Sequence, residues 1–271
     1  MIFSVRHPNT YLKHGFLMYN MVNNQKKTNR NLKVKTIIDK IIVVEGLDKT
    51  GKSTFVNIFE NEYYHLNGEK QDKLKKFSFP NNTTPIGNMI RNELLSSNPD
   101  QDKVSTPNFL AEMSHFWMVE LYNQHCKNAI YQNTTNNINT STPQIPTTSY
   151  IFDRYFISTM AYQAFYNNSF ADLDFIKTSL NNNKFIKLPT DVIFLDMPNE
   201  VIIQRTLEDA KNGLTDFNDT TDVGILNKRR KAYIDSIKFL KGMHIDFHWF
   251  EDVSGLDYND LAKVLLGKIF K

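Results

Sequence analysis

The phosphate-binding pattern in residues 46–53 constrains the fold of this chain more than any other feature. The segment reads GLDKTGKS and fits G-x-x-x-x-G-K-[ST]. An apolar, β-branched run over 37–45 precedes it and predicts a strand buried on both faces, while helical spacing follows from Ser53 to Leu66. In such a loop, backbone N–H groups and the start of the next helix point at phosphate oxygens. The sequence therefore predicts a strand, a loop and a helix that bind a nucleotide.

The loop supplies the candidate residues for binding ATP. They are Gly46, Leu47, Asp48, Lys49, Thr50, Gly51, Lys52, Ser53 and the adjoining Thr54. Lys52 is expected to reach the β- and γ-phosphates, and the Ser53 hydroxyl is expected to ligate Mg²⁺. The alternative is a glycine-rich turn without a ligand, which the flanking strand and helix disfavour.

Strand and helix patterns alternate along the rest of the chain. Further buried-strand patterns occur at 74–79, 150–153, 191–196 and 244–250. Helical patterns occur at 86–95, 107–131, 158–166, 200–210, 225–240 and 257–270. Such alternation predicts parallel βαβ units. We therefore expect an α/β domain with a five-stranded parallel sheet and helices on both faces.

The charge of the chain is divided between two parts. The sequence has 32 Lys plus Arg and 29 Asp plus Glu, a formal charge of +3. Seven of the basic residues precede Asp39, the first acidic residue, so the remainder carries 25 − 29 = −4. We interpret 1–36 as a basic extension, disordered or targeting, and 37–271 as the folded domain. Dispersed cations without a recognition fold predict no specific nucleic-acid binding.

Composition also bears on the compartment. The single cysteine, Cys126, cannot form an internal disulfide, which favours a reducing environment. No apolar run approaches the roughly 20 residues that span a bilayer, so we expect no membrane association. We predict a cytoplasmic protein, with mitochondrial targeting through the extension as the alternative. Residues 132–149 carry no charge and are nearly free of apolar side chains, which predicts a surface insertion.

A second candidate motif, Asp153-Arg154, follows the apolar strand pattern at 150–153. Its position predicts that both side chains lie at the carboxyl edge of the sheet, together with the loop. Arginine can hold a phosphate through two hydrogen bonds, and aspartate can accept from a metal-bound water. A strand-end ion pair would give the same dipeptide. Ser158 and Tyr162, four residues apart, share one helical face, although ordinary packing also explains Tyr162.

Four segments together resemble the thymidylate kinase family. EGLDKTGKST, FPNNTTPIG, FDRYFISTMAY and LPTDVIFLDMP occur in its order and spacing, and the resemblance covers roughly 37–271. It implies a P-loop nucleoside monophosphate kinase fold with a lid segment. It also implies transfer of the γ-phosphoryl group of ATP to a pyrimidine nucleoside monophosphate, for which we favour dTMP. The same resemblance implies Mg²⁺ and a homodimer, for which the helix that carries Phe109 and Leu121 is the candidate interface.

The resemblance implies roles for particular residues. Asp48 would approach the acceptor sugar, while Lys49 would sit at the transferring phosphate. Asp153 would hold Mg²⁺, and Arg154 the acceptor phosphate. The catalytic candidates are therefore Lys52, Lys49, Asp48 and Arg154, with Ser53 and Asp153 at the metal. The acceptor-binding candidates are Asp48, Phe79, Arg91, Arg154, Ser158 and Tyr162, and Arg205 is placed near the donor adenine.

The chain also departs from the family pattern. Asn82 stands where F-P-x-R has arginine, and the SHFWM segment lacks the N-R-W-type arginine. Arg91 is a candidate replacement, with a solvated helix charge as the alternative. The lid segment 211–222 lacks the usual acidic-aromatic signature. A basic run follows it on a helix, either over the donor phosphates or as a solvated face: Lys228, Arg229, Arg230 and Lys231.

These departures keep two other functions open. Mitochondrial UMP/CMP kinases of the related type share the GLDxTGK loop and the DRYxxST segment, and they also lack the F-P-x-R arginine. A nucleotide-binding pseudoenzyme with a decayed acceptor site is the second alternative. The complete loop and the Asp153-Arg154 pair argue against the pseudoenzyme.

Overall fold

The fold is built on a parallel five-stranded sheet, as the sequence predicts. The computed structural model describes residues 38–67, 74–94, 105–135, 148–182, 185–214 and 219–270. All of these belong to one compact unit, Thr36–Lys271. The strands are β1 (Ile38–Glu45), β2 (Leu74–Ser78), β3 (Thr148–Asp153), β4 (Asp191–Leu195) and β5 (Asp246–Phe250), in the order β2-β3-β1-β4-β5. The strand that precedes the loop is therefore at the centre of the sheet.

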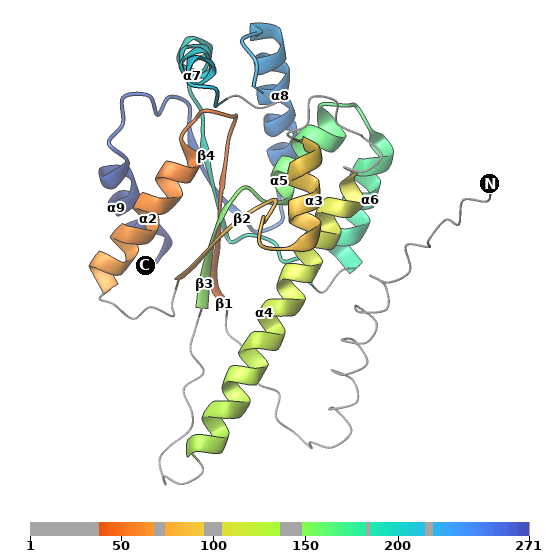
Figure 1. Ribbon diagram of the computed structural model, residues 1–271, viewed down its shortest axis with the longest axis vertical. Helices are drawn as coiled ribbons and strands as arrows, with labels where there is room; N and C mark the ends of the chain where they lie inside the picture. Colours follow the sequence, from red (N-terminus) through yellow and green to blue (C-terminus); the bar gives the residue numbers. More distant parts are fainter. Residues whose placement is uncertain are drawn as a thin grey trace, which may run out of the picture. The chain divides into compact units, whose positions relative to one another are not determined.

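Helices cover both faces of the sheet (Figure 1). The helices that cover one face are α2 (Lys52–Asn67) and α9 (Tyr258–Ile269). The opposite side has α3 (Pro85–Leu94), α4 (Thr106–Thr135), α5 (Phe156–Thr159), the π-helix η1 (Met160–Phe165), α6 (Phe170–Asn182) and α8 (Val223–Phe239). The helix α7 (Asn199–Lys211) follows β4. Among the described residues, none of the helices combines the length and apolarity that a bilayer crossing requires.

Three segments differ from the sequence-based assignment. The helix α6 was not predicted, because Ile176 is its one fully buried residue and asparagines flank it. The helix expected at 158–166 is a short α-turn that continues as η1, a form that often occurs at functional sites. The predicted insertion at 132–149 is shorter at both ends, because α4 continues to Thr135 and β3 begins at Thr148. Its centre and the basic extension lie outside the described residues.

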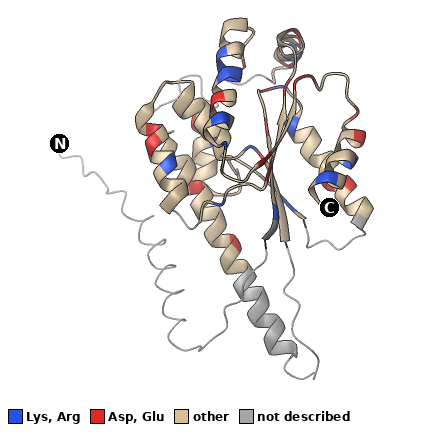
Figure 2. Ribbon diagram, turned by 180° about the vertical axis from the view of Figure 1, so that it is seen from behind, with Lys and Arg blue, Asp and Glu red and all other residues tan. Residues whose placement is uncertain are grey.

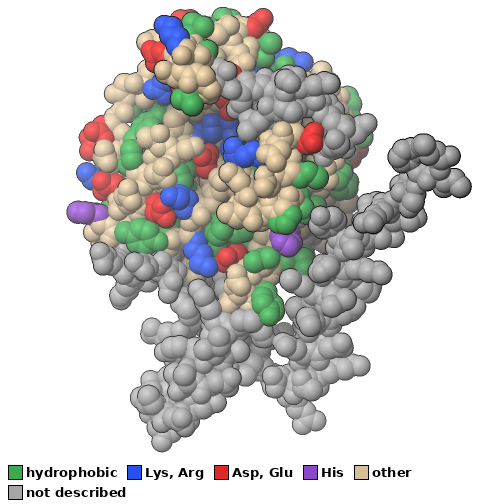
Figure 3. All heavy atoms as spheres, viewed as in Figure 1, with side chains coloured by type: hydrophobic (Ala, Val, Ile, Leu, Met, Phe, Trp, Pro, Cys, Tyr) green, Lys and Arg blue, Asp and Glu red, His purple; other side chains and the backbone are tan. Residues whose placement is uncertain are grey.

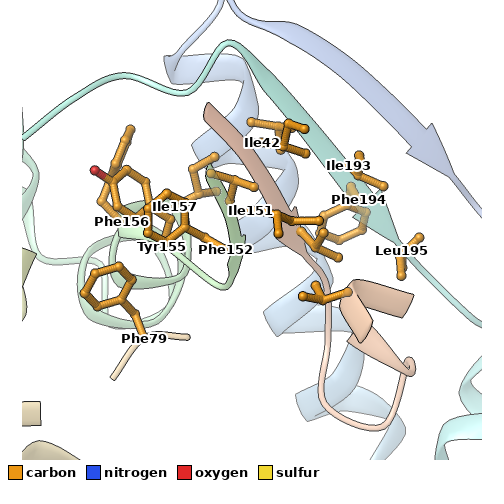
Figure 4. Packing of buried hydrophobic residues seen from close by; sticks show 14 of the residues in the cluster. Ile42, Phe79, Ile151, Phe152, Tyr155, Phe156, Ile157, Ile193, Phe194 and Leu195 are labelled. Atoms are coloured by element: carbon orange, nitrogen blue, oxygen red, sulfur yellow. The ribbon is translucent and has the colours of Figure 1, made fainter. Parts of the chain in front are cut away.

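The core lies between the sheet and its helices. The predicted apolar stripe of α4 is confirmed, since Phe109, Met113, Phe116 and Trp117 are buried, whereas Leu121 is exposed. Rings from β2, β3 and α4 pack together, and the Trp117 indole donates to the Tyr155 hydroxyl at 2.8 Å. Figure 4 shows Phe152 of β3 beside Phe79 and Tyr155. This aromatic packing fixes β3 and the residues that follow it.

Strand register brings the ends of three strands to one level. Val44 pairs with Asp153, which pairs in turn with Ser78. The residues immediately beyond these positions leave the sheet at the same carboxyl edge. Parallel α/β sheets bind their ligands at this edge.

Replacing Phe152 by alanine tests the aromatic core. Phe152→Ala is expected to lower the free energy of unfolding by about 3–5 kcal/mol, because it removes a buried ring and leaves a cavity. Urea unfolding followed by circular dichroism measures the change. Val264→Ala, on an exposed side chain of α9, is the control and should change that free energy by about 0.5 kcal/mol or less. Equal unfolding midpoints for the two variants would contradict the packing described above.

Candidate functional site

The loop between β1 and α2 has a backbone that its glycines make possible. Gly46 has φ +149°, and a Cβ there would lie 2.2 Å from the Leu195 carbonyl oxygen. Gly51 has φ +81°, and a Cβ there would lie 2.6 Å from the Tyr258 hydroxyl, which donates to the Thr50 carbonyl at 2.8 Å. Side chains at either glycine would therefore clash as well as strain the backbone. The loop is held in a curled form by its neighbours.

Lys52 contacts the loop through its ammonium group, which could bind an anion. Its side chain is buried, and its Nζ donates to the Leu47 carbonyl at 2.5 Å. Burial lowers the pKa of Lys52 to about 8, and the nearby Arg154 adds to the effect. A phosphate group beside this ammonium would oppose both causes and favour the charged form.

Ser53 and Asp153 meet at the exposed mouth of the loop. The Ser53 hydroxyl donates to a carboxylate oxygen of Asp153, which ends β3. Thr54, the next residue of α2, is also exposed. The structure therefore brings together the two side chains that the sequence assigned to a metal. Their hydroxyl and carboxylate oxygens are the hard donors that Mg²⁺ prefers.

Arg154 is the centre of the hydrogen-bond network at this edge. It has φ +67°, a conformation that costs a non-glycine residue about 1–2 kcal/mol. Its guanidinium donates to an Asp48 carboxylate oxygen, to the Ser158 hydroxyl at 3.2 Å and to the Tyr233 hydroxyl at 2.8 Å. The surrounding contacts fix a strained arginine in one position, as is common at functional sites.

Asp48 joins the same network from the loop. Besides Arg154, it accepts a hydrogen bond from the Tyr162 hydroxyl at 3.2 Å. Burial by itself would raise the pKa of Asp48, but nearby cations, led by Arg154 and Lys52, outweigh burial and lower it. The structure thus brings Asp48, Arg154, Ser158 and Tyr162 together, as the sequence predicts.

Lys49 faces a different part of the molecule. Its Nζ lies 2.7 Å from Asp209 of α7 and 3.0 Å from Asp219, in the segment predicted as the lid. Burial would lower the pKa of Lys49, but its bonds to these carboxylates outweigh burial and raise the pKa. Arg205 is nearby, where it donates to the Lys49 carbonyl at 2.9 Å. Arg205 therefore contacts the backbone of the loop.

The other acceptor-side candidates lie in packed surroundings. Phe79 is 4% exposed and packs against Phe116, so its ring belongs to the aromatic core. Arg91 of α3 lies near Glu112 of α4, whose pKa it lowers against the raising effect of burial. Glu112 accepts from the Asn81 backbone N–H at 2.7 Å and so fixes the segment in which Asn82 replaces the arginine of the family pattern.

Figure 2 marks basic residues in blue along α8, and the cations of the basic run lie in different environments. Arg229 lies over the Tyr162 ring, with its Cζ 5.6 Å from the centroid, and lines a small cavity with Asp48. Arg230 donates instead to Asp196 at 2.7 Å, and the exposed Lys231 pairs with Asp235. Arg229 therefore faces the site, whereas Arg230 joins α8 to the residues after β4 and Lys231 pairs within α8.

The cavity lies between the loop, α7 and the start of α8. Its polar lining comes from Asp48, Lys49, Asp219, Thr220 and Arg229. Acidic and basic side chains are interspersed on the face shown in Figure 3, so this face has no broad field of one sign.

Sequence reasoning missed four residues of this network. Glu45 was assigned only to the strand, although a charged residue at the end of a buried strand is itself a signal. Tyr233 was hidden in the helical pattern of α8, and no local pattern marks Asp209 or Asp219 as partners of Lys49. These contacts depend on segments that are distant in sequence.

Comparisons with known proteins identify the family of this chain. A family model for thymidylate kinase matches residues 44–245. A thymidylate kinase of Francisella tularensis subsp. holarctica (strain OSU18) is 30% identical over 202 residues, which cover 74% of this chain and 84% of the relative. The enzyme of strain LVS is 29% identical over the same length. The solved structure of a Candida albicans thymidylate kinase has a TM-score of 0.53 and 21% identity, and the match covers 86% of this chain and 92% of that one, which supports the fold.

The match of the family model includes the loop, Asp153 and Arg154, and the whole of α8. These are the segments that form the network around Asp48. The chain belongs to the thymidylate kinase family.

Proposed function

We propose that this protein transfers the γ-phosphoryl group of ATP to dTMP and releases ADP and dTDP. The observation that carries the proposal is the convergence of Lys52, Asp48 and Arg154 at the carboxyl edge of the sheet. Family membership and the relatives' names support this substrate pair. In the transfer, an oxygen of the acceptor phosphate bonds to the γ-phosphorus as the bond to the β–γ bridging oxygen breaks.

The protein side of this reaction is positioning and electrostatic stabilisation. The N–H groups of the curled loop and Lys52 would hold the donor phosphates. Arg154 would hold the acceptor phosphate, and Asp48, already fixed by Tyr162, would orient the acceptor sugar. No covalent intermediate is needed, because both phosphates are held at one edge. Ser158 would act beside Arg154, while Phe79 would support the acceptor segment from the core.

Ser53 and Asp153 would hold Mg²⁺ together with the nucleotide. Their oxygen donors suit this ion, which keeps several waters and takes the remaining ligands from substrate phosphates. Among the described residues there is no cluster of three or more His, Cys, Asp or Glu that could hold a metal by itself. When bound, Mg²⁺ would supply charge neutralisation on the β- and γ-phosphates.

Lys49 links this site to the residues between α7 and α8. We propose that it leaves Asp209 and Asp219 for the transferring phosphate when the donor binds. Arg229 would contribute charge from the start of α8. Residues 211–222 would act as the lid, although 215–218 lie outside the described residues. Arg205 would brace the loop on the donor side.

Other features of the protein stay predictions. A homodimer through α4 draws support from the exposed side chains of Leu121 and Tyr122. A cytoplasmic location, or a mitochondrial one directed by the extension, depends on residues outside those described.

The first prediction concerns Lys52. Lys52→Ala is expected to lower kcat/KM for phosphoryl transfer from ATP to dTMP about 100- to 1000-fold, the usual effect of removing one preorganised charge-stabilising donor. A coupled ADP-release assay with Mg²⁺ measures it. Lys263→Ala, on an exposed part of α9, is the control and should retain wild-type rates. Equal rates for wild type and Lys52→Ala would refute the mechanism.

The second prediction concerns the acceptor. Among dTMP, dUMP, UMP and CMP, we expect dTMP to have the highest kcat/KM, with dUMP about tenfold or more lower, because one methyl group is worth about 1–3 kcal/mol in a fitted pocket. The same assay run with each acceptor measures the ratios. Faster turnover of UMP or CMP would move the protein to the alternative substrate class. ATP binding without turnover of any acceptor would favour the pseudoenzyme.

The third prediction separates the two candidate arginines. Arg154→Ala is expected to raise KM for dTMP about 30-fold or more, because breaking a buried charge pair costs about 2–5 kcal/mol. Arg91→Ala should change KM for dTMP by about threefold or less, because the described effect of Arg91 is on Glu112 of α4, outside the loop. Initial rates at varied dTMP and saturating ATP measure both. A larger increase for Arg91→Ala than for Arg154→Ala would reverse the assignment.

A further inference from the structure

Glu45 is a buried carboxylate to which the proposed reaction gives no role. It ends β1, directly before the loop, and its exposure is 0%. The three residues before it, Ile42, Val43 and Val44, are also fully buried. A buried charge is costly unless it is hydrogen-bonded, so the partners of Glu45 indicate why it is there.

Those partners are all at the start of α5. One oxygen of Glu45 accepts from the Tyr155 N–H at 2.9 Å and from the Ser158 N–H at 3.2 Å. The other oxygen accepts from the Ser158 hydroxyl at 2.6 Å. Tyr155 is the N-cap residue, and its side chain makes no capping bond. Glu45 therefore supplies, from a neighbouring strand, the acceptor that a helix start normally takes from its own N-cap.

The same contacts determine how Arg154 is held. The Arg154 N–H donates to the Val44 carbonyl at 3.0 Å, and the next N–H, from Tyr155, donates to Glu45. The end of β1 thus binds consecutive residues of the turn in which Arg154 has a positive φ. The Ser158 hydroxyl donates to Glu45 and accepts from the guanidinium of Arg154. Glu45 orients both the backbone and one acceptor of this arginine.

We propose that Glu45 is a positioning residue that fixes Arg154 and Ser158 for the acceptor phosphate. The inference rests on the proposed phosphoryl transfer and adds to it a residue that does not touch either substrate. Its carboxylate acts through the hydroxyl of Ser158 and the start of α5.

The charge state of Glu45 decides how this network is arranged. Burial raises the pKa of Glu45 to about 7, although the Ser158 bond and Arg154 oppose burial. The other titratable groups that face it are Lys52 and Tyr233. A protonated Glu45 would donate to Ser158 or lose that bond, and the Ser158 hydroxyl would turn toward Tyr233. The ionised form of Glu45 therefore matches the observed arrangement, in which the Ser158 hydroxyl donates to Glu45 and accepts from Arg154.

Comparing Glu45→Gln with wild type across pH tests the proposal. The kcat/KM for dTMP is measured from pH 5.5 to 8.5 at saturating ATP. We expect the two proteins to be similar at pH 5.5 and wild type to exceed the variant at least tenfold at pH 8.5, with the change centred near pH 7. The titration of substrate phosphates is common to both proteins and cancels in the ratio. KM for ATP should change less than threefold.

Asp191→Asn is the matched control. Asp191 is a buried carboxylate at the opposite end of the sheet, where it contacts His248 and Lys40. The ratio of its kcat/KM for dTMP to that of wild type should not vary between pH 5.5 and 8.5. The same pH-dependent ratio for both variants would show a general effect of losing a buried carboxylate and would overturn the proposal.

Thermal unfolding separates positioning from folding. Because the raised pKa makes ionised Glu45 destabilising, wild-type stability contributed by this group is present below pH 4.5 and lost as the pH rises through about 7. Glu45→Gln should therefore melt no lower than wild type at pH 8.5 while being less active there. If it does not fold, Ser158→Ala removes the same bond and should lose at least tenfold in kcat/KM for dTMP.

Other outcomes reject the inference. If the ratio of kcat/KM for dTMP between an active wild type and Glu45→Gln does not change with pH, Glu45 has no role at the acceptor site. The proposed function would stand in that case. Wild-type rates for Ser158→Ala would do the same. Absence of dTMP turnover by the wild type would overturn both proposals.

Discussion

The parallel pairing of β1 with β3 is the constraint on which the site depends. Val44 lies opposite Asp153, so the loop after β1 and the turn after β3 leave the sheet side by side. A shift of one residue would move every side chain of β1 to the other face of the sheet. Fully buried aliphatic residues on both strands fix the register. The aromatic packing of Phe152 then holds β3 against the helices beyond it (Figure 4).

Arg154 shows how the protein places charge at this edge before any substrate is bound. Its guanidinium contacts Asp48, Ser158 and Tyr233 in a position that its backbone conformation disfavours. Several hydrogen bonds hold it there, and Glu45 accepts from the backbone N–H groups of Tyr155 and Ser158, which follow Arg154 in the chain. Preorganised charges of this kind need no rearrangement during a reaction. The cost is a buried carboxylate that favours its neutral form.

Lys49 illustrates a limit of reasoning from family motifs. The motif places this lysine at the transferring phosphate, but in the structure its ammonium is paired with Asp209 and Asp219. The two descriptions are compatible if the lysine changes partners when the donor binds. Arg91, the candidate replacement for the arginines missing at Asn82 and on the next helix, acts electrostatically on Glu112 and stays a prediction. Arg229 is the additional cation that lines the cavity.

Local sequence patterns were enough to predict most strands and helices, the loop at 46–53 and the position of Asp153-Arg154 at the same edge of the sheet. Local patterns indicate these features: apolar runs, helical spacing and glycines where the backbone must turn. The helix α6 escaped because few of its residues are buried. Only the folded structure shows that Glu45 caps α5, 110 residues away in the sequence, and that Lys49 contacts Asp209, 160 residues away. Such contacts exist because sheet pairing brings distant segments together, and no local pattern records which side chains then meet.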